Sequence, residues 1–431
     1  MSQKTDSADE RAAGFAARHF RWNFGILLVD GIGFFAGLAF FDPNTVLPVL
    51  LKELGAADWQ VGLSRLILTL GFALPSLLAA HWIHGRAEHK GFLIKACAIG
   101  RIPLLTIPGV LIWHGTSNPG LALTWFFFIY AIFWLLDGGC AVSWFDIVGK
   151  TIPGRYRGRF FGALQTSSGL AAMGSGAIVA LVLGSPRFPF PYEFAFLAGL
   201  WCVGALFSQI SLFFIREPPG EVDSGPKPGF RTYLRNVVPL LKQNPRLSRL
   251  ILARFLLDGG ALAAPFYVLF ARENLHVTLQ TVGIYTVLVS IGKVSTGPLW
   301  GWISDHFGPV IGFRAVAVSV VTIPMLALIA AGCAPWALPI SFFLLGAVQD
   351  GLWMTGSTVM LESVADRDRP LVIGVAALLQ SPSAIYGVTG GVIAQTFSYP
   401  VVFSGTLIVT TAGLFAAMRL SRAADSVESA Q

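Results

Sequence analysis

Two aspartates with similar surroundings stand deep inside long apolar segments. Asp137 precedes Lys150 by 13 residues and Asp350 precedes Arg367 by 17, and each aspartate is followed by Gly. At 1.5 Å per residue, ~20–25 Å of helix separates each carboxyl group from the nearest basic end. Burial at that depth favours the neutral acid, so both are candidate proton carriers. The alternative is a structural aspartate that bonds a neighbouring helix beside a close contact permitted by Gly.

Three more polar side chains in apolar segments are suited to a substrate site. Lys293 lies near the middle of its segment, where it can pair with Asp350 or Asp258, or hold an anionic group of a solute. Gln165 and Gln380 stand 215 residues apart at matching places in the two halves. Such buried amides can bind a solute or bond another helix.

Asp42 lies in the run FDPNTVLP, inside the first apolar segment. If Pro43 and Pro48 only bend that helix, Asp42 faces a central cavity. If the helix ends at Phe41, Asp42 is an exposed turn residue. The sequence leaves both possibilities open.

A second kind of acidic position suggests gating or structural pairing. Asp258 follows Arg254 by four residues, which is the spacing of an ion pair on one helix face. Asp30 shares the Asp-Gly pair of Asp258 (LVDG and LLDG), and we expect it to act similarly. These three residues are predicted to lie near the inner face of the membrane.

Nothing in the residue pattern suggests an enzyme. The four cysteines lie far apart in apolar segments, and His81, His84 and His89 lack a well-placed Cys or acid. No nucleophile–base spacing, nucleotide loop or soluble domain is present, so we predict no catalytic residue, no metal and no cofactor.

The segments that must position these residues are membrane helices. Hydrophobic residues make up 54% of the 431 positions and charged residues only 12%, far below the roughly 25% of soluble domains. Twelve segments each meet or nearly meet the ~20 residues that cross a bilayer as a helix. We therefore predict an all-α integral membrane protein with twelve spans, at about 24–51, 59–84, 91–113, 121–149, 158–184, 194–215, 248–271, 279–303, 309–331, 335–362, 371–396 and 400–420.

The order of landmarks is repeated in the two halves of the chain. Lys52-Glu53 and Arg272-Glu273 are 220 residues apart, and Gly71 and Gly292 are 221 apart. The offset falls to 213 between Asp137 and Asp350, which small insertions explain. A repeat of this kind predicts two pseudo-symmetric six-helix bundles with a substrate between them.

The basic residues are concentrated on one side of this topology. With the N-terminus inside, 25 of the 30 Lys and Arg residues fall on cytoplasmic segments, including four in region 86–101, and three on outer loops. This is the positive-inside bias, so the net charge of +7 does not indicate nucleic acid. We expect a multi-pass protein of the bacterial cytoplasmic (inner) membrane with both termini in the cytoplasm.

The expected domain organisation follows from these spans. Two bundles are separated by a Pro-, Gly- and charge-rich linker that ends in a basic amphipathic helix, which we expect to lie on the inner leaflet. The predicted parts are a cytoplasmic tail at 1–23, a bundle at 24–215, the linker at 216–247, a second bundle at 248–420 and a tail at 421–431.

The run GWISDHFG at 301–308 resembles the signature loop of the major facilitator superfamily. Gly301, Asp305 and Gly308 match that loop, whereas His306 and Pro309 replace its basic positions. The run RYRGRFFG after the fourth span is similar to the arginine-rich loop of the same superfamily.

This resemblance implies that spans 1, 4, 7 and 10 line a central cavity, where Asp42, Asp137, Asp258 and Asp350 occur. It also implies that Asp305 belongs to a cytoplasmic charge network that latches the outward-facing state. The fourth span lacks the Arg-x-x-x-Gln-Gly pattern of proton-driven drug exporters.

These observations predict a monomeric secondary transporter that moves a small organic solute by alternating access. We expect proton coupling through Asp137 and Asp350, with export of a cationic or zwitterionic compound slightly favoured. The alternative is a carrier of an organic anion or sugar-like solute that uses Lys293, Gln165 and Gln380.

Overall fold

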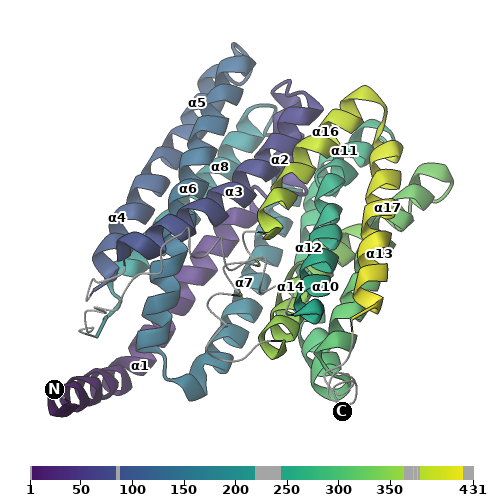
Figure 1. The fold of residues 1–431 in the computed structure, drawn as a ribbon. Coiled ribbons are helices and arrows are strands. Elements are labelled where there is room, and N and C mark those ends of the chain that lie inside the picture. Colours follow the sequence, from purple (N-terminus) through teal and green to yellow (C-terminus); the bar gives the residue numbers. More distant parts are fainter. Residues whose placement is uncertain are drawn as a thin grey trace. The chain divides into compact units, whose positions relative to one another are not determined.

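The structure, a computed structural model, describes residues 2–83, 88–218, 244–363, 372, 376 and 379–420 (Figure 1). Within these ranges the chain is helical and contains no strand, which confirms the all-α prediction. The first half comprises α1 (Ser2–Ala39), α2 (Val46–Glu53), α3 (Asp58–Ile83), α4 (Lys90–Arg101), η1 (Ile102–Thr106), α5 (Ile107–His114), α6 (Pro119–Thr151), α7 (Gly154–Leu183) and α8 (Tyr192–Phe213). The second half comprises α10 (Pro245–Leu257), η2 (Asp258–Leu262), α11 (Phe266–Glu273), α12 (Leu279–Phe307), α13 (Pro309–Gly332), α14 (Ala337–Glu362), η4 (Ser381–Ile385), α16 (Tyr386–Thr396) and α17 (Tyr399–Met418).

The chain forms two compact units. Unit 1 consists of Met1–Asp42, Glu53–Gly55 and Ile67–Pro226, and unit 2 of Pro43–Lys52, Ala56–Leu66 and Lys227–Gln431. Helix α2 and the first part of α3 therefore pack with the second half of the chain. The predicted bundle boundaries at 24–215 and 248–420 remain predictions.

Ten stretches in the described part of the chain are long and apolar enough to cross a bilayer. They correspond to ten of the twelve predicted spans, and the predicted spans at 59–84 and 371–396 are not among them. The count of twelve remains a prediction. Most of the predicted linker (216–247) and the whole predicted tail at 421–431 lie outside the described residues.

The segment 1–23, predicted to be a cytoplasmic tail, is helical from Ser2 and continuous with the rest of α1 (Figure 1). Its place outside the membrane remains a prediction. No proline interrupts this segment, and its alanines, arginines and glutamate favour helix, so the helix extends beyond the apolar part.

The first span of each half is broken in the middle. Helix α1 ends at Ala39, residues 40–45 form turns, and α2 then runs to Glu53. In the second half, α10 passes into the 3₁₀ turn η2, and α11 runs to Glu273. Helices α2 and α11 both have eight residues and end 220 positions apart, as the sequence offset predicts.

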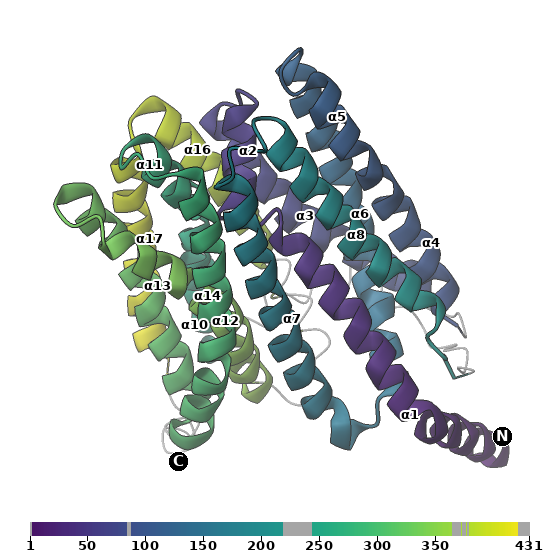
Figure 2. The same ribbon diagram turned by 180° about the vertical axis from the view of Figure 1, so that it is seen from behind.

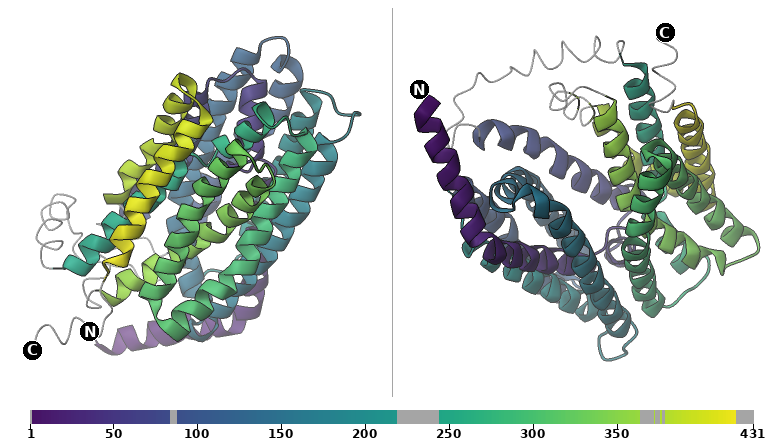
Figure 3. Two further views of the ribbon diagram at one scale, coloured as in Figure 1. Left: turned by 90° about the vertical axis from the view of Figure 1, so that its right-hand side faces the viewer. Right: turned by 90° about the horizontal axis from the view of Figure 1, so that it is seen from below.

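Helix packing within each unit is visible from several sides. In unit 1, α1 packs along α8 and α7, and α4 packs against α6 (Figure 2). In unit 2, α12 packs against α14, while α17 lies against α13 and α10 (Figure 3).

Glycines allow the same close helix contact in both units. A Cβ at Gly138 of α6 would collide with the carbonyl oxygens of Gly71 and Phe72 on α3. A Cβ at Gly346 of α14 would likewise collide with the Val289 carbonyl oxygen on α12. Backbone-to-backbone contact of this kind requires the absence of a side chain.

Candidate functional site

Two groups of charged residues lie within the helices of unit 2. Lys293 Nζ of α12 lies 3.5 Å from Asp350 Oδ1 of α14, with 28% and 30% of the two side chains exposed. Of the two partners that the sequence allowed for Lys293, the structure places Asp350 at ion-pair distance. The protein therefore buries this pair only partly.

The second group of unit 2 surrounds the break in its first span. Arg254 Nε donates a hydrogen bond to Asp258 Oδ1 at 3.2 Å, as the i,i+4 spacing suggests. Arg65 of α3 interacts electrostatically with Asp258 and donates a hydrogen bond to Asn44 Oδ1 at 3.4 Å. Arg254 Nη1 also donates to the Leu352 carbonyl, so Arg254 joins α10 to α14. The gating role of Arg254 and Asp258 remains a prediction.

Asp42 takes neither of the two conformations foreseen from the sequence. The helix ends at Ala39, so it is not merely bent, yet Asp42 is half-buried and Phe41 and Asn44 beside it are buried. Asp42 therefore lies in a buried break of the first span. Broken helices at membrane depth occur where backbone groups are enclosed by protein or line a cavity.

The remaining predicted site residues are dispersed. Gln165 is half-buried on α7 in unit 1, and Gln380 is half-buried just before η4 in unit 2. Asp305 is exposed in the last turn of α12. Their roles in binding and latching remain predictions.

Unit 1 contains a charged cluster that the sequence analysis only partly anticipated. Asp30 of α1 is 5% exposed and accepts hydrogen bonds from Ser208 Oγ and, at 2.8 Å, from Trp144 Nε1. Asp137 of α6 is half-buried and interacts electrostatically with Asp30 and with Arg101.

Arg101 was wrongly assigned to a cytoplasmic segment. It is 6% exposed, ends α4, and lies inside the candidate span Lys90–His114. Its own position within the predicted span 91–113 was the signal that could have revealed this. Pro103 and Pro108 follow, and prolines break the helix into α4, η1 and α5 because they lack a donor N–H.

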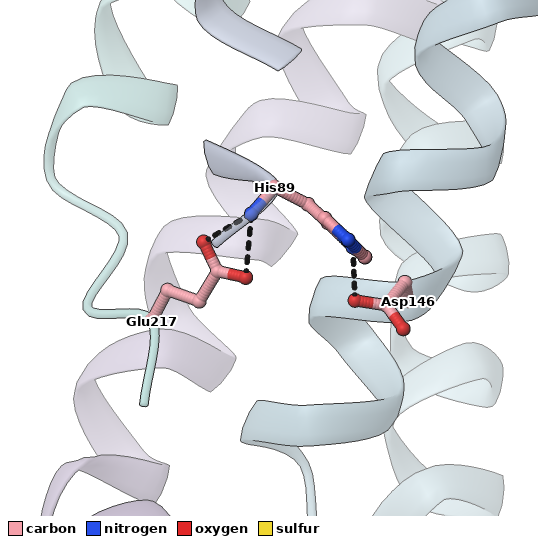
Figure 4. A group of neighbouring side chains, drawn as sticks. All are labelled: His89, Asp146 and Glu217. Carbon is pink, nitrogen blue, oxygen red and sulfur yellow. Dashed lines mark hydrogen bonds and ion pairs between the residues drawn. The ribbon is translucent and has the colours of Figure 1, made fainter. Parts of the chain in front are cut away.

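A third cluster joins the start of α4 to α6 and to the end of α8 in unit 1 (Figure 4). Glu217 accepts hydrogen bonds from the backbone N–H groups of His89 and Lys90 at 2.8–3.0 Å, and His89 Nδ1 lies 2.6 Å from Asp146 Oδ2. The three acceptor groups could hold a metal, but Lys150 Nζ lies 2.7 Å from Asp146 and 3.4 Å from Glu217. An ammonium group therefore already occupies the place of a cation.

A polar cluster in unit 2 joins the ends of its two eight-residue helices. Lys52 Nζ lies 3.0 Å from Asp58 and 3.5 Å from Glu273, and the Tyr399 hydroxyl donates to Glu273 at 2.9 Å. Burial lowers the pKa of Lys52, but the two carboxylates outweigh burial and the pKa is raised. Nearby, a Cβ at Gly62 would collide with the Gly387 carbonyl, so α3 and α16 touch backbone to backbone.

Comparisons with known proteins agree with this architecture. A family model described as Major Facilitator Superfamily matches residues 255–431. Multidrug resistance protein MdtG of Citrobacter koseri is 24% identical over 393 residues, which is 88% of this chain and 89% of that protein.

Solved transporters share the fold. A mutant of the nucleoside transporter NupG superposes with a TM-score of 0.71 at 12% identity, covering 93% of this chain and 100% of the other. The D-xylose–proton symporter superposes with a TM-score of 0.63 at 15% identity, covering 95% and 97%. The resemblance noted in the sequence is therefore confirmed.

Proposed function

We propose that the chain is a membrane transporter of the major facilitator superfamily, and that it exports a cationic or zwitterionic organic compound by proton-coupled alternating access. The observation that carries this proposal is a set of acid–base partners at span depth in each unit, centred on Asp350 with Lys293 and on Asp137 with Arg101. Ions are retained at that depth only where they serve a pathway or are paired.

The Lys293–Asp350 pair supplies the coupling step in unit 2. Protonation of Asp350 removes its attraction for Lys293, and loss of the proton restores it. About 30% of each side chain is exposed, and we infer that this part faces water, which delivers the proton without unfolding of the surrounding helices. Asp137 occupies the matching position in unit 1.

The preference for a cation rests on relatives and on charge. MdtG, which is 24% identical to this chain, is named as a multidrug resistance protein. The two carboxylates near Arg101 give this cluster a net negative charge when both are ionised. We place the protein in the bacterial inner membrane as a monomer with both termini cytoplasmic.

A second candidate function is supported by unit 2. The two groups described above comprise three cations and two carboxylates (Arg65, Arg254, Lys293, Asp258 and Asp350). This excess of positive charge favours a carrier of an organic anion or a sugar-like solute that contacts Lys293, Gln165 and Gln380. Solute binding that is lost in Lys293→Ala and kept in Asp350→Asn would select this function.

The decisive experiment uses proteoliposomes with an imposed pH gradient and the fluorescent cation ethidium, followed by hits from a thermal-shift screen of a metabolite library. We expect uphill movement of a probe in the wild type. Asp137→Asn and Asp350→Asn should each abolish uphill movement and spare exchange. Glu362→Gln, a change at an exposed acid on α14, is the matched control.

Two outcomes would overturn parts of this function. If no screened solute responds to a pH gradient, proton coupling is excluded for those solutes. If both Asn variants accumulate the probe as the wild type does, neither aspartate carries the proton.

A further inference from the structure

The buried cation of unit 1 is the starting point. Arg101 follows Lys90 by 11 residues and precedes His114 by 13 within one candidate span, so about 16–20 Å of helix separates it from either end. With 6% of its surface exposed, it cannot extend to a membrane surface. A guanidinium at this depth requires compensation by nearby negative charge.

The compensation of Arg101 is incomplete. Nη1 donates to Gln209 Oε1 at 3.4 Å, and the guanidinium lies 5.6 Å from the centre of the Phe34 ring. Its Nε is buried and has no hydrogen-bond partner in the part of the chain that the structure describes. Asp30 and Asp137 both interact with it electrostatically.

The two carboxylates differ in their hydrogen bonds. Asp30 receives donors from two helices, Ser208 on α8 and Trp144 on α6. Asp137 receives no hydrogen bond from any residue within the described ranges. Hydrogen bonds to the ionised form of a carboxyl group stabilise that form. Asp30 is therefore the carboxylate that stays ionised, and Asp137 is the one that can bind and release a proton.

We propose that Asp30, Arg101 and Asp137 form a single one-proton site in which Asp30 is the permanent counter-ion of Arg101 and Asp137 binds and releases the proton. One guanidinium and two carboxylates are neutral only when one proton is bound. When Asp137 releases the proton to water, its carboxylate competes with Asp30 for Arg101, and the vacant Nε supplies a donor. This inference rests on the proposed proton coupling and changes the predicted gating role of Asp30 to that of a positioning residue.

Few other groups can titrate at this site. The thiols of Cys97 on α4 and Cys140 on α6 face Arg101, and Gln209 on α8 is neutral. Asp137 interacts electrostatically with Arg101, with Asp30 and with the Cys140 thiol. A protonated thiol carries no charge, so within the described ranges the charge balance rests on the three named residues.

The test measures protonation without a transport substrate. Infrared spectra of the purified full chain in lipid, recorded as the pH is changed, report the C=O band of a protonated carboxyl group. Among the carboxyl bands we expect one that disappears in Asp137→Asn. Glu362→Gln should leave it unchanged.

Two substitutions should move the midpoint of this band in opposite directions. Arg101→Gln removes the cation and should raise the proton affinity of Asp137 at least tenfold. Asp30→Asn frees Arg101 for Asp137 and should lower that affinity by a similar factor. Arg101→Lys, which keeps the charge, should stay close to the wild type. If Arg101→Gln does not fold, the shift of the band midpoint in Asp30→Asn tests the proposal by itself.

The possible failures are distinguishable. A band that persists in Asp137→Asn, or a midpoint that is unchanged in Asp30→Asn, overturns the one-proton site. Intact shifts in a protein that moves no solute with a pH gradient would instead keep the site and remove proton coupling from the proposed function.

Discussion

The two units repeat a backbone arrangement but differ in their buried charges. In unit 1 the cluster contains one cation and two carboxylates, whereas the two groups around Lys293 and Arg254 in unit 2 together contain three cations and two carboxylates. Asp30 is held by neutral donors, while Asp258 is held by a guanidinium four residues away. The contrast shows that helix packing restricts which positions must be Gly, but leaves each half free to acquire its own charges.

The largest effect should come from removing the most buried cation. Arg101→Gln leaves two buried carboxylates with no cation and should lower the free energy of unfolding by about 3–5 kcal/mol. Lys293→Gln, at a side chain that is 28% exposed, should cost only about 1 kcal/mol. Thermal unfolding of both variants in the same detergent checks this difference. Equal losses of unfolding free energy in the two variants would mean that the deeper burial of Arg101 does not make it more important for stability than Lys293.

The repeated glycine contacts should respond equally in the two units. Gly138→Ala and Gly346→Ala each place a Cβ against a carbonyl oxygen and should cost about 1–3 kcal/mol through overpacking. Gly149→Ala and Gly301→Ala are controls, the first on the helix of Gly138, since neither meets another atom within 4 Å. The controls should be neutral or stabilise by up to about 1 kcal/mol. If only one of the two Gly→Ala variants were destabilised, the close helix contact would not be a feature common to both units.

At the edge of unit 1, Glu217→Gln should weaken the start of α4. The Glu217 carboxylate accepts from the first two backbone N–H groups there and lies near Lys150, so its loss should cost about 1–2 kcal/mol. Hydrogen exchange should accelerate at His89 and Lys90 and stay unchanged in α14. Uniform acceleration would indicate global destabilisation instead.

The smallest effect is expected at the edge of unit 2, where Lys52→Met should cost about 1 kcal/mol or less. Because the pKa of Lys52 is raised in the folded protein, its contribution is fully present below the unfolded value of about 10.4. The contribution is lost as the pH rises through the folded pKa. The difference in Tm between wild type and Lys52→Met should therefore shrink above about pH 10.4. A difference that persists at higher pH would indicate packing of the lysine stem.

The sequence predicted where most buried charged residues lie along the chain better than it predicted which residues they contact. Asp137 and Asp350 were singled out because an acid in a long apolar segment is conspicuous, and their role remains a prediction. The Arg254–Asp258 pair was foreseen because residues four apart lie on one face of a helix. Arg101 was missed because it stands only a few residues from a basic cytoplasmic stretch. The Glu217 contact with α4 was not foreseen, since it joins residues 128 positions apart.

The sequence alone determined that the chain is helical, crosses a membrane and is built from two related halves. Those properties follow from apolar length and periodic repetition, which are local. Only the tertiary structure decided that α2 and the start of α3 pack with the other half, that Asp42 lies in a buried break, and that Arg101 faces two aspartates. Depth along a helix can be counted from sequence, but the direction in which a side chain points depends on which helices pack around it.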